Sequence, residues 1–277
     1  MIVIVDAVRT AMGGFQGSLS SLSAPQLGSV VIQETIKRAG IAATDVDEVI
    51  FGCVLPAGLK QAPARQAMRL AGVPDTVGAT TINKVCGSGM KAVMQAADAI
   101  KAGSANIIIA GGMESMSNAP YLLDKARGGL RMGHGKIIDH MFQDGLEDAE
   151  SGLSMGVLAQ EMADKKGYTR EQQDAYAIAS LQKAVDAVNN GYFKDEIAAV
   201  TVSSRKGDVV VDHDEQPFNA KIDKIPTLRP AFKKDGTITA ANSSSISDGA
   251  SALVITSDAI AREKGLTPLA QVVAYAT

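Results

Sequence analysis

Cys86 is the residue whose setting could do chemistry. It lies in the segment 83–90 (Asn-Lys-Val-Cys-Gly-Ser-Gly-Met), between a strand-like run at 80–83 and a stretch at 90–102 that is rich in good helix formers. A thiol at such a turn faces the unpaired N–H groups of a helix start, whose positive dipole end stabilises a thiolate. An isolated cysteine is more often an inert core residue, but this strand, turn and glycine context leads us to predict that Cys86 is a positioned nucleophile.

No catalytic role is predicted for the second cysteine, for the serine of a hydrolase-like motif or for the histidines. Cys53 lies in the apolar run 50–55, which favours simple packing. The sequence at 152–156 fits the Gly-x-Ser-x-Gly elbow of serine hydrolases, but that elbow must follow a strand and residues 144–151 are acidic and turn-like. The histidines all lie in polar stretches without a ligand spacing, so we expect solvated surface side chains and no metal site. They are His134, His140 and His213.

Composition and charge narrow the class of protein. A chain of 277 residues with 46% hydrophobic residues suits one or two globular domains. A formal net charge of −3 with mixed signs argues against a nucleic-acid surface. No apolar run approaches the length of a membrane span, which is about 20 residues. Two distant cysteines and no signal peptide indicate a reducing compartment. We therefore expect a cytoplasmic enzyme with no nucleic-acid or membrane partner.

The first part of the chain alternates between strand and helix patterns. This alternation predicts an α/β fold with a parallel sheet flanked by helices, in which ligands bind at the carboxyl ends of the strands. Cys86 falls at one such end. The strand candidates are 2–5, 49–51, 80–83, 106–110 and 252–255, and the helix candidates are 25–39, 64–71, 90–102, 155–162, 170–188 and 258–264.

Several stretches, in this order, resemble those of the thiolase family. They are 4–11 (Ile-Val-Asp-Ala-Val-Arg-Thr-Ala), 54–58, 63–67, 83–92, 110–117 (Ala-Gly-Gly-Met-Glu-Ser-Met-Ser), 228–232 and 241–250. The resemblance covers essentially the whole chain but only the first part of a thiolase. It implies a thiolase-like N-terminal lobe with a mostly parallel sheet flanked by helices, formed by residues 1–118 and 248–268. It also implies an inserted, mainly helical loop domain at 119–247 that binds coenzyme A, and the first strand of a missing C-terminal lobe at 269–277.

The same resemblance implies a function. An acetyl-CoA acetyltransferase moves acyl groups between thioesters through a cysteine acyl-enzyme, here on Cys86, and forms or cleaves acetoacetyl-CoA or other 3-ketoacyl-CoA. Coenzyme A thioesters are then substrates, and no cofactor is expected. Family positions that contact coenzyme A match four residues, of which Ser244 meets the pantetheine arm and the others line its tunnel: Leu146, Met155, Phe232 and Ser244. Thiolases are dimers or tetramers, so a homo-oligomer is expected.

The motifs that complete a thiolase active site are missing from this sequence. The family carries a catalytic histidine, a second cysteine and an asparagine in Gly-His-Pro, Cys-x-Gly-Gly and Asn-Glu-Ala motifs, and none of these occurs here. We therefore expect a chain truncated after Thr277 and catalytically incomplete. Two alternatives remain open at this point: a relative of the β-ketoacyl synthases, and a non-catalytic fragment that binds coenzyme A or serves in assembly.

Overall fold

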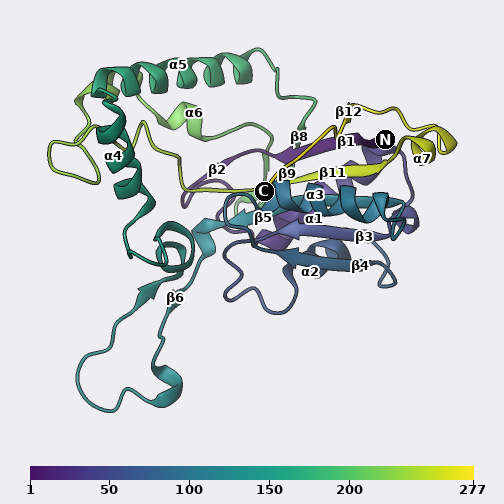
Figure 1. Cartoon of the computed structure of the whole chain (residues 1–277), viewed down its shortest axis with the longest axis horizontal. Coiled ribbons are helices and arrows are strands. Elements are labelled where there is room, and N and C mark those ends of the chain that lie inside the picture. Colours follow the sequence, from purple (N-terminus) through teal and green to yellow (C-terminus); the bar gives the residue numbers. More distant parts are fainter.

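One eight-stranded mixed sheet organises the chain, and the computed structural model describes all residues, 1–277 (Figure 1). The strand order is β12-β1-β11-β5-β3-β4, with β2 paired to β11 and β8 paired to β1. The long strands are β1 (Ile2–Thr10), β3 (Glu48–Gly52), β4 (Gly78–Ile82), β5 (Ile107–Ser115) and β11 (Ser247–Ser257). The short strands are β2 (Gly13–Gly14), β8 (Ile197–Ala198) and β12 (Ala270–Gln271).

The pairing is parallel in part of the sheet and antiparallel in the rest. β3 pairs in parallel with both β4 and β5, as the strand and helix alternation predicts. β11 is antiparallel to both β5 and β1, so β1 runs in the same direction as β5. The reason is the connection: the chain leaves the sheet at the carboxyl end of β5, and it re-enters as β11 at that same end. The α/β class is thus confirmed, with a mixed sheet.

Helices cover both faces of this sheet. α1 (Ala24–Ala39) and α2 (Pro63–Leu70) pack on one face, and α3 (Ser88–Lys101) packs on the other. α1 starts with the Ser23 backbone N–H donating to Gln26 Oε1 at 2.9 Å, and it ends at Gly40, whose φ of 68° suits glycine. The short helix α7 (Asp258–Glu263) follows β11.

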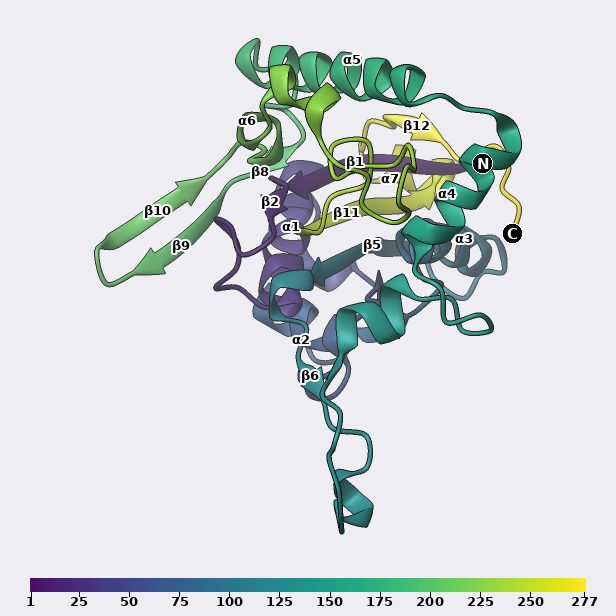
Figure 2. The ribbon, with the colours of Figure 1, turned by 90° about the vertical axis from the view of Figure 1, so that its left-hand side faces the viewer.

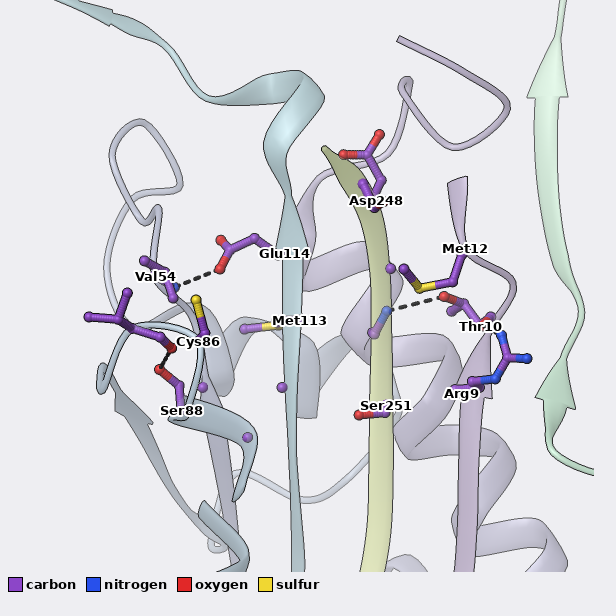
Figure 3. A pocket seen from close by; sticks show the side chains of 17 residues that line it. Arg9, Thr10, Met12, Val54, Cys86, Ser88, Met113, Glu114, Asp248 and Ser251 are labelled. Carbon is purple, nitrogen blue, oxygen red and sulfur yellow. Dashed lines mark hydrogen bonds between the residues drawn. The ribbon is translucent and has the colours of Figure 1, made fainter. Parts of the chain in front are cut away.

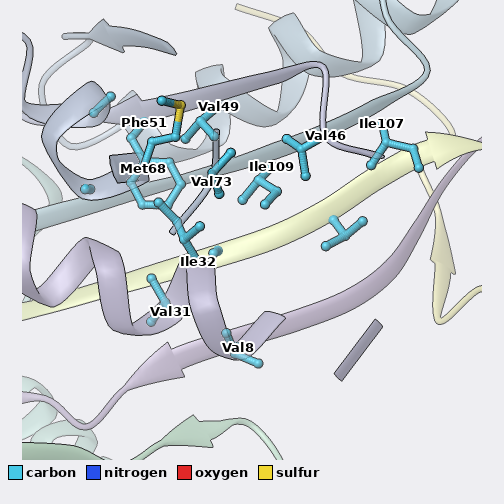
Figure 4. Packing of buried hydrophobic residues seen from close by; sticks show 14 of the residues in the cluster. Val8, Val31, Ile32, Val46, Val49, Phe51, Met68, Val73, Ile107 and Ile109 are labelled. Atoms are coloured by element: carbon cyan, nitrogen blue, oxygen red, sulfur yellow. The ribbon is translucent and has the colours of Figure 1, made fainter. Parts of the chain in front are cut away.

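Strand periodicity assigns side chains to the two faces. Val49 and Phe51 belong to the core under α1 and α2, whereas Ile50 belongs to the core under α3. Ile107 and Ile109 likewise face α1 and α2, among the buried side chains in Figure 4. This period-two alternation within continuous apolar runs is what a sheet covered on both sides requires.

Between β5 and β11 the chain makes a long excursion outside this core, residues 116–246. Figure 2 shows two of its parts extending away from the sheet, the hairpin β6–β7 and the ribbon β9–β10, while α5 crosses above the sheet. Thr169 and Gln172 form a capping box at the start of α5, with Thr169 N–H donating to Gln172 Oε1 at 3.0 Å. The elements are η2 (Met116–Asn118), β6 (Tyr121–Leu122), η3 (Ala126–Gly128), β7 (Ile138–Asp139), η4 (Phe142–Leu146), α4 (Met155–Lys166), α5 (Arg170–Asn189), β9 (Val200–Ser204), β10 (Gly207–Val211), α6 (Gln216–Asn219) and η5 (Ile222–Thr227). The excursion also contributes β8 to the sheet, and η1 (Ala43–Asp45) precedes β3.

The last residues form less strand than the pattern at 269–277 suggests. Only Ala270 and Gln271 pair, both with β1. Beyond them the chain lies against α3, where the Tyr275 hydroxyl donates to Asp98 and the Lys101 ammonium lies 4.8 Å from the Tyr275 ring centroid. None of the helices combines the length and the apolar character that a transmembrane span requires.

Candidate active site

A cleft of about 400 Å³ opens where β1, β3 and β5 end and α3 begins (Figure 3). β1 contributes Arg9 and Thr10, β5 contributes Met113 and Glu114, and the start of β11 forms another wall. Cys86 lines this cleft. The location is the one that the sequence predicts, because the carboxyl ends of neighbouring parallel strands meet at one edge of a sheet.

A hydrogen-bonded turn presents the Cys86 thiol. Val85, immediately before it, adopts a left-handed conformation with φ of 48°. The Ser88 hydroxyl donates to the Val85 carbonyl at 2.6 Å and accepts the Lys84 N–H at 2.8 Å. The Asn83 side-chain oxygen accepts the Val85 N–H at 2.9 Å. The thiol of Cys86 is free and exposed, two residues before the first residue of α3.

Two glycines allow close contacts beside the cleft, Gly52 with the start of α3 and Gly111 with β11. A Cβ placed on Gly52 would lie 2.5 Å from the Ser88 Cβ, and one on Gly111 would lie 1.9 Å from the Ser251 carbonyl oxygen. Either side chain would push the helix or β11 away from the cleft. These two glycines were not singled out from the sequence. A glycine in an otherwise apolar strand was the available signal.

Cys53 differs from Cys86 in exposure, which controls the access of reagents and substrates to a thiol. It is 1% exposed, and its Sγ lies 3.6 Å from Glu114 Oε1. Burial, followed by the nearby Glu114 carboxylate, raises the pKa of Cys53 to about 12. The thiol therefore stays protonated at neutral pH, in agreement with the packing role predicted for it.

Glu114 is a residue of the cleft that sequence reasoning missed. Its two carboxylate oxygens accept consecutive backbone N–H groups, those of Val54 at 2.8 Å and Leu55 at 3.0 Å. Burial raises the pKa of Glu114, although these N–H groups oppose the shift. An acidic residue near the end of an apolar strand was the signal in the sequence.

The prediction for His140 was wrong. This side chain is buried, at 4% exposure, with Nδ1 2.6 Å from Asp144 Oδ2. The turn of η4 places Asp144 beside it, a spacing of four residues that the sequence already contained. His134 and His213 are exposed, as predicted. None of the three lines the cleft.

A second cavity lies near the first, and the short segment 244–247 connects their walls. A groove of about 880 Å³ lies between α5 and the segment 241–244, and Ser244 lines it. Ser247 lines the cleft of Cys86. Because three residues span at most about 11 Å, the two cavities lie close together. Tyr168 and Tyr176 of the α5 region form part of the other wall of the groove.

The other residues predicted to contact coenzyme A line neither of these two cavities. Met155 begins α4, and the Phe232 ring packs so closely on Gly156 that a Cβ there would be 2.2 Å from it. Leu146 ends η4 and is half-buried. The structure thus places Phe232 against the residue that follows Met155, while Leu146, Met155 and Phe232 line neither cavity.

Comparison with known proteins decides the family. The family described as thiolase, N-terminal domain, matches residues 2–259. The chain belongs to the thiolase family. An acetyl-CoA acetyltransferase of Pseudomonas aeruginosa is 51% identical over 278 residues, which cover 100% of this chain and 71% of that protein. One of Escherichia coli is 52% identical over 277 residues, covering 99% of this chain and 70% of that protein.

A solved structure extends the similarity to the fold. A thiolase from Ascaris suum, crystallised in complex with coenzyme A, superposes with a TM-score of 0.90 at 43% sequence identity, covering 96% of this chain and 68% of that one. The predicted thiolase-like fold is therefore confirmed. Membership of the thiolase family takes the place of one alternative left open by the sequence, a relative of the β-ketoacyl synthases.

In this thiolase chain, a polar clamp at the start of α5 holds the segment that carries Phe232 and Ser244. Arg170 donates to Asp174 Oδ2 at 2.6 Å and to the carbonyl oxygens of Ile225 and Leu228, at 3.0 and 2.9 Å. Asn242 donates to Asp174 Oδ1 at 3.1 Å. Asp174 is buried. The clamp thus fixes both ends of residues 225–242 to one turn of α5.

Proposed function

We propose that this chain is an acetyl-CoA acetyltransferase that takes an acyl group from a coenzyme A thioester onto Cys86. The observation that carries the proposal is the contrast between its two thiols: Cys86 is exposed in the cleft at the start of α3, and Cys53 is buried and held protonated. Membership of the thiolase family supports it. The substrates would be acetyl-CoA and 3-ketoacyl-CoA, with no further cofactor.

The acylation step uses groups that are present. The Cys86 Sγ attacks the thioester carbonyl carbon, a C–Sγ bond forms, and the bond between that carbon and the sulfur of coenzyme A breaks. Coenzyme A leaves as a thiolate and takes up the proton that Cys86 lost. The positive end of the α3 dipole favours both the Cys86 thiolate and the negative charge that develops on the carbonyl oxygen.

The two adjoining cavities suit a long substrate. We place the acyl end in the cleft of Cys86 and the pantetheine arm along Ser244, at the junction with the larger groove. Residues 119–247 then act as the coenzyme A-binding domain, with Leu146, Met155 and Phe232 flanking the arm. The clamp around Asp174 would keep this segment in place.

Carbon–carbon bond formation or cleavage needs a further acid and base. No histidine lines the cleft, and the Glu114 carboxylate there is occupied by two backbone N–H groups. We therefore propose that these 277 residues support acylation of Cys86 but little turnover of acetoacetyl-CoA.

Acyl transfer is tested by incubating the protein with acetyl-CoA and locating the label by peptide mass spectrometry. We expect one acetyl group on the peptide that contains Cys86, and none in the Cys86→Ser variant. Iodoacetamide near neutral pH should likewise modify Cys86 in preference to Cys53. Binding of coenzyme A without acetylation would favour the non-catalytic alternative, and rapid acetoacetyl-CoA turnover would contradict the proposed incompleteness.

The assembly and location of the protein are also proposals. We propose a homo-oligomer, a dimer or tetramer, because β4 forms an edge of the sheet with an unpaired row of backbone groups. We propose a cytoplasmic location because both cysteines are free. Light scattering and fractionation test these two points.

A further inference from the structure

Glu114 connects the end of β5 to the chain that leaves β3. Its carboxylate oxygens accept the N–H groups of Val54 and Leu55, at 2.8 and 3.0 Å. Neither of these two residues is in a strand, so the carboxylate supplies the hydrogen bonds that the sheet no longer offers. The segment 53–55 is therefore anchored across the sheet to β5 through one side chain.

The same segment supports the turn that carries Cys86. The Cys53 N–H donates to the Ile82 carbonyl at 3.0 Å, one residue before the turn begins. Asn83 Nδ2 donates to the Val54 carbonyl at 3.4 Å, and its Oδ1 accepts the Val85 N–H at 2.9 Å. A continuous path of hydrogen bonds thus runs from the Glu114 side chain to the residue before Cys86.

Packing provides a second path. Gly52, at the end of β3, is in such close contact with Ser88 that no Cβ would fit between them. Ser88 is the first residue of α3, and its hydroxyl closes the turn by donating to the Val85 carbonyl. A shift of the chain after β3 would therefore move the first turn of α3 as well.

Ionisation of the Glu114 carboxyl group does not stabilise the folded protein. Burial raises the pKa of Glu114, and the titratable groups that face it are the Cys53 thiol and the His140 ring. Because the folded protein holds this proton more tightly than the unfolded chain does, the contribution of Glu114 to stability is complete at low pH. That contribution is lost as the pH rises through the pKa of the folded state.

We propose that Glu114 is a positioning residue for Cys86, holding the chain after β3 so that the turn at 83–88 presents the thiol to the cleft. The inference rests on the proposed role of Cys86 as the acyl acceptor. It assigns to Glu114 no contact with the acyl group.

The test compares alkylation rates of Cys86 by iodoacetamide at pH 7, measured for each cysteine by peptide mass spectrometry. In Glu114→Gln we expect the rate at Cys86 to fall about tenfold, because a turn released from its anchor presents the thiol in its reactive position less often. Asn83→Ala should reduce the rate similarly, and the double variant should be no slower than either single one, because both act along one path. The midpoint of thermal unfolding should stay within about 4 °C.

Asp47→Asn is the matched control. Asp47 Oδ2 also accepts two consecutive backbone N–H groups, those of Asn106 and Ile107, but at the opposite end of β5. Its substitution should leave alkylation of Cys86 unchanged. Glu114→Asp, which keeps the charge on a shorter side chain, should give an intermediate rate, and it keeps the test available if the Gln variant does not fold.

The outcomes separate this inference from the proposed function. Additive effects of the Glu114 and Asn83 substitutions, an unchanged rate in Glu114→Gln, or an equal fall in Asp47→Asn would each overturn the positioning role alone. A wild-type Cys86 that reacts no faster than Cys53 would overturn the proposed nucleophile, and with it this inference.

Discussion

The sheet and the excursion between β5 and β11 are held together by different forces. α1 has 16 residues, of which seven are buried, and these are mostly apolar. α5 has 20 residues, of which only Asp174 is buried. The sheet therefore depends on apolar burial, which is not directional, whereas the position of α5 in the excursion depends on a few polar contacts with defined geometry.

This difference affects the two halves of the proposed site. Cys86 lies on the apolar sheet layer, and Ser244 lies on a segment that is held by the Arg170, Asp174 and Asn242 clamp. A substitution in the core should unfold the whole protein, whereas one in the clamp should release the excursion and leave the sheet intact.

Phe51→Ala should have the largest effect on stability. Phe51 is fully buried between the sheet and the helices α1 and α2, and truncating such a side chain costs about 3–5 kcal/mol. Urea unfolding followed by circular dichroism measures the loss. Tyr192→Ala, at an exposed aromatic side chain after α5, is the control and should leave the transition unchanged. Equal losses in the two variants would remove the distinction between the two regions.

Asp174→Ala should release the excursion without unfolding the sheet. Removing the carboxylate leaves Arg170 and Asn242 without their common partner, at a cost of about 1–3 kcal/mol. We expect faster amide exchange at 225–244 and weaker binding of coenzyme A, with exchange in β5 and β11 unchanged. Hydrogen exchange followed by mass spectrometry measures both regions at once. Faster exchange both at 225–244 and in β5 and β11 would mean that the clamp supports the whole fold.

Acid should loosen the contact between the excursion and β1. Burial opposes ionisation of Asp214, but its hydrogen bonds with Arg9 and Met12 prevail, so the pKa of Asp214 is lowered. Its stabilising contribution is therefore present above the unfolded pKa of about 3.9 and is lost as the pH falls through the lower, folded value.

Asp214→Asn should reproduce that loss at neutral pH. Pepsin cleavage within 200–216, measured across the acid range, should rise at higher pH in the variant than in the wild type. If the two proteins show the same pH dependence of cleavage, another group controls this contact.

Lys37→Ala should have the smallest effect. The ion pair between Lys37 and Glu34 on α1 is 3.2 Å long, but the lysine is exposed to solvent. Exposed pairs contribute little, because water and salt screen them. We expect no measurable change in the unfolding midpoint by calorimetry, and a clear decrease would show that polar contacts support the sheet region too.

Local patterns predicted the parts of the fold that depend on neighbouring residues. The turn at Cys86, the helix that follows Thr169 and the packing of Cys53 follow from short segments, and the structure agrees with each. His140 was misjudged because its ring is buried against a distant part of the chain, where the Ala57 N–H lies 3.4 Å from its Nε2, and local polarity does not reveal such a contact. The strand predicted at 269–277 pairs through two residues only, since β-pairing depends on a partner edge as well as on composition.

The sequence by itself determined the family, the alternation of strands and helices, and the position of Cys86 between a strand and a helix start. These features are encoded by residue type and short spacing. Only the tertiary structure decided that β11 lies antiparallel between β1 and β5, that Glu114 reaches across to Val54 and Leu55, and that Ser244 and Cys86 line adjoining cavities. Each of these joins residues far apart in the chain, and such contacts are set by the packing of whole elements.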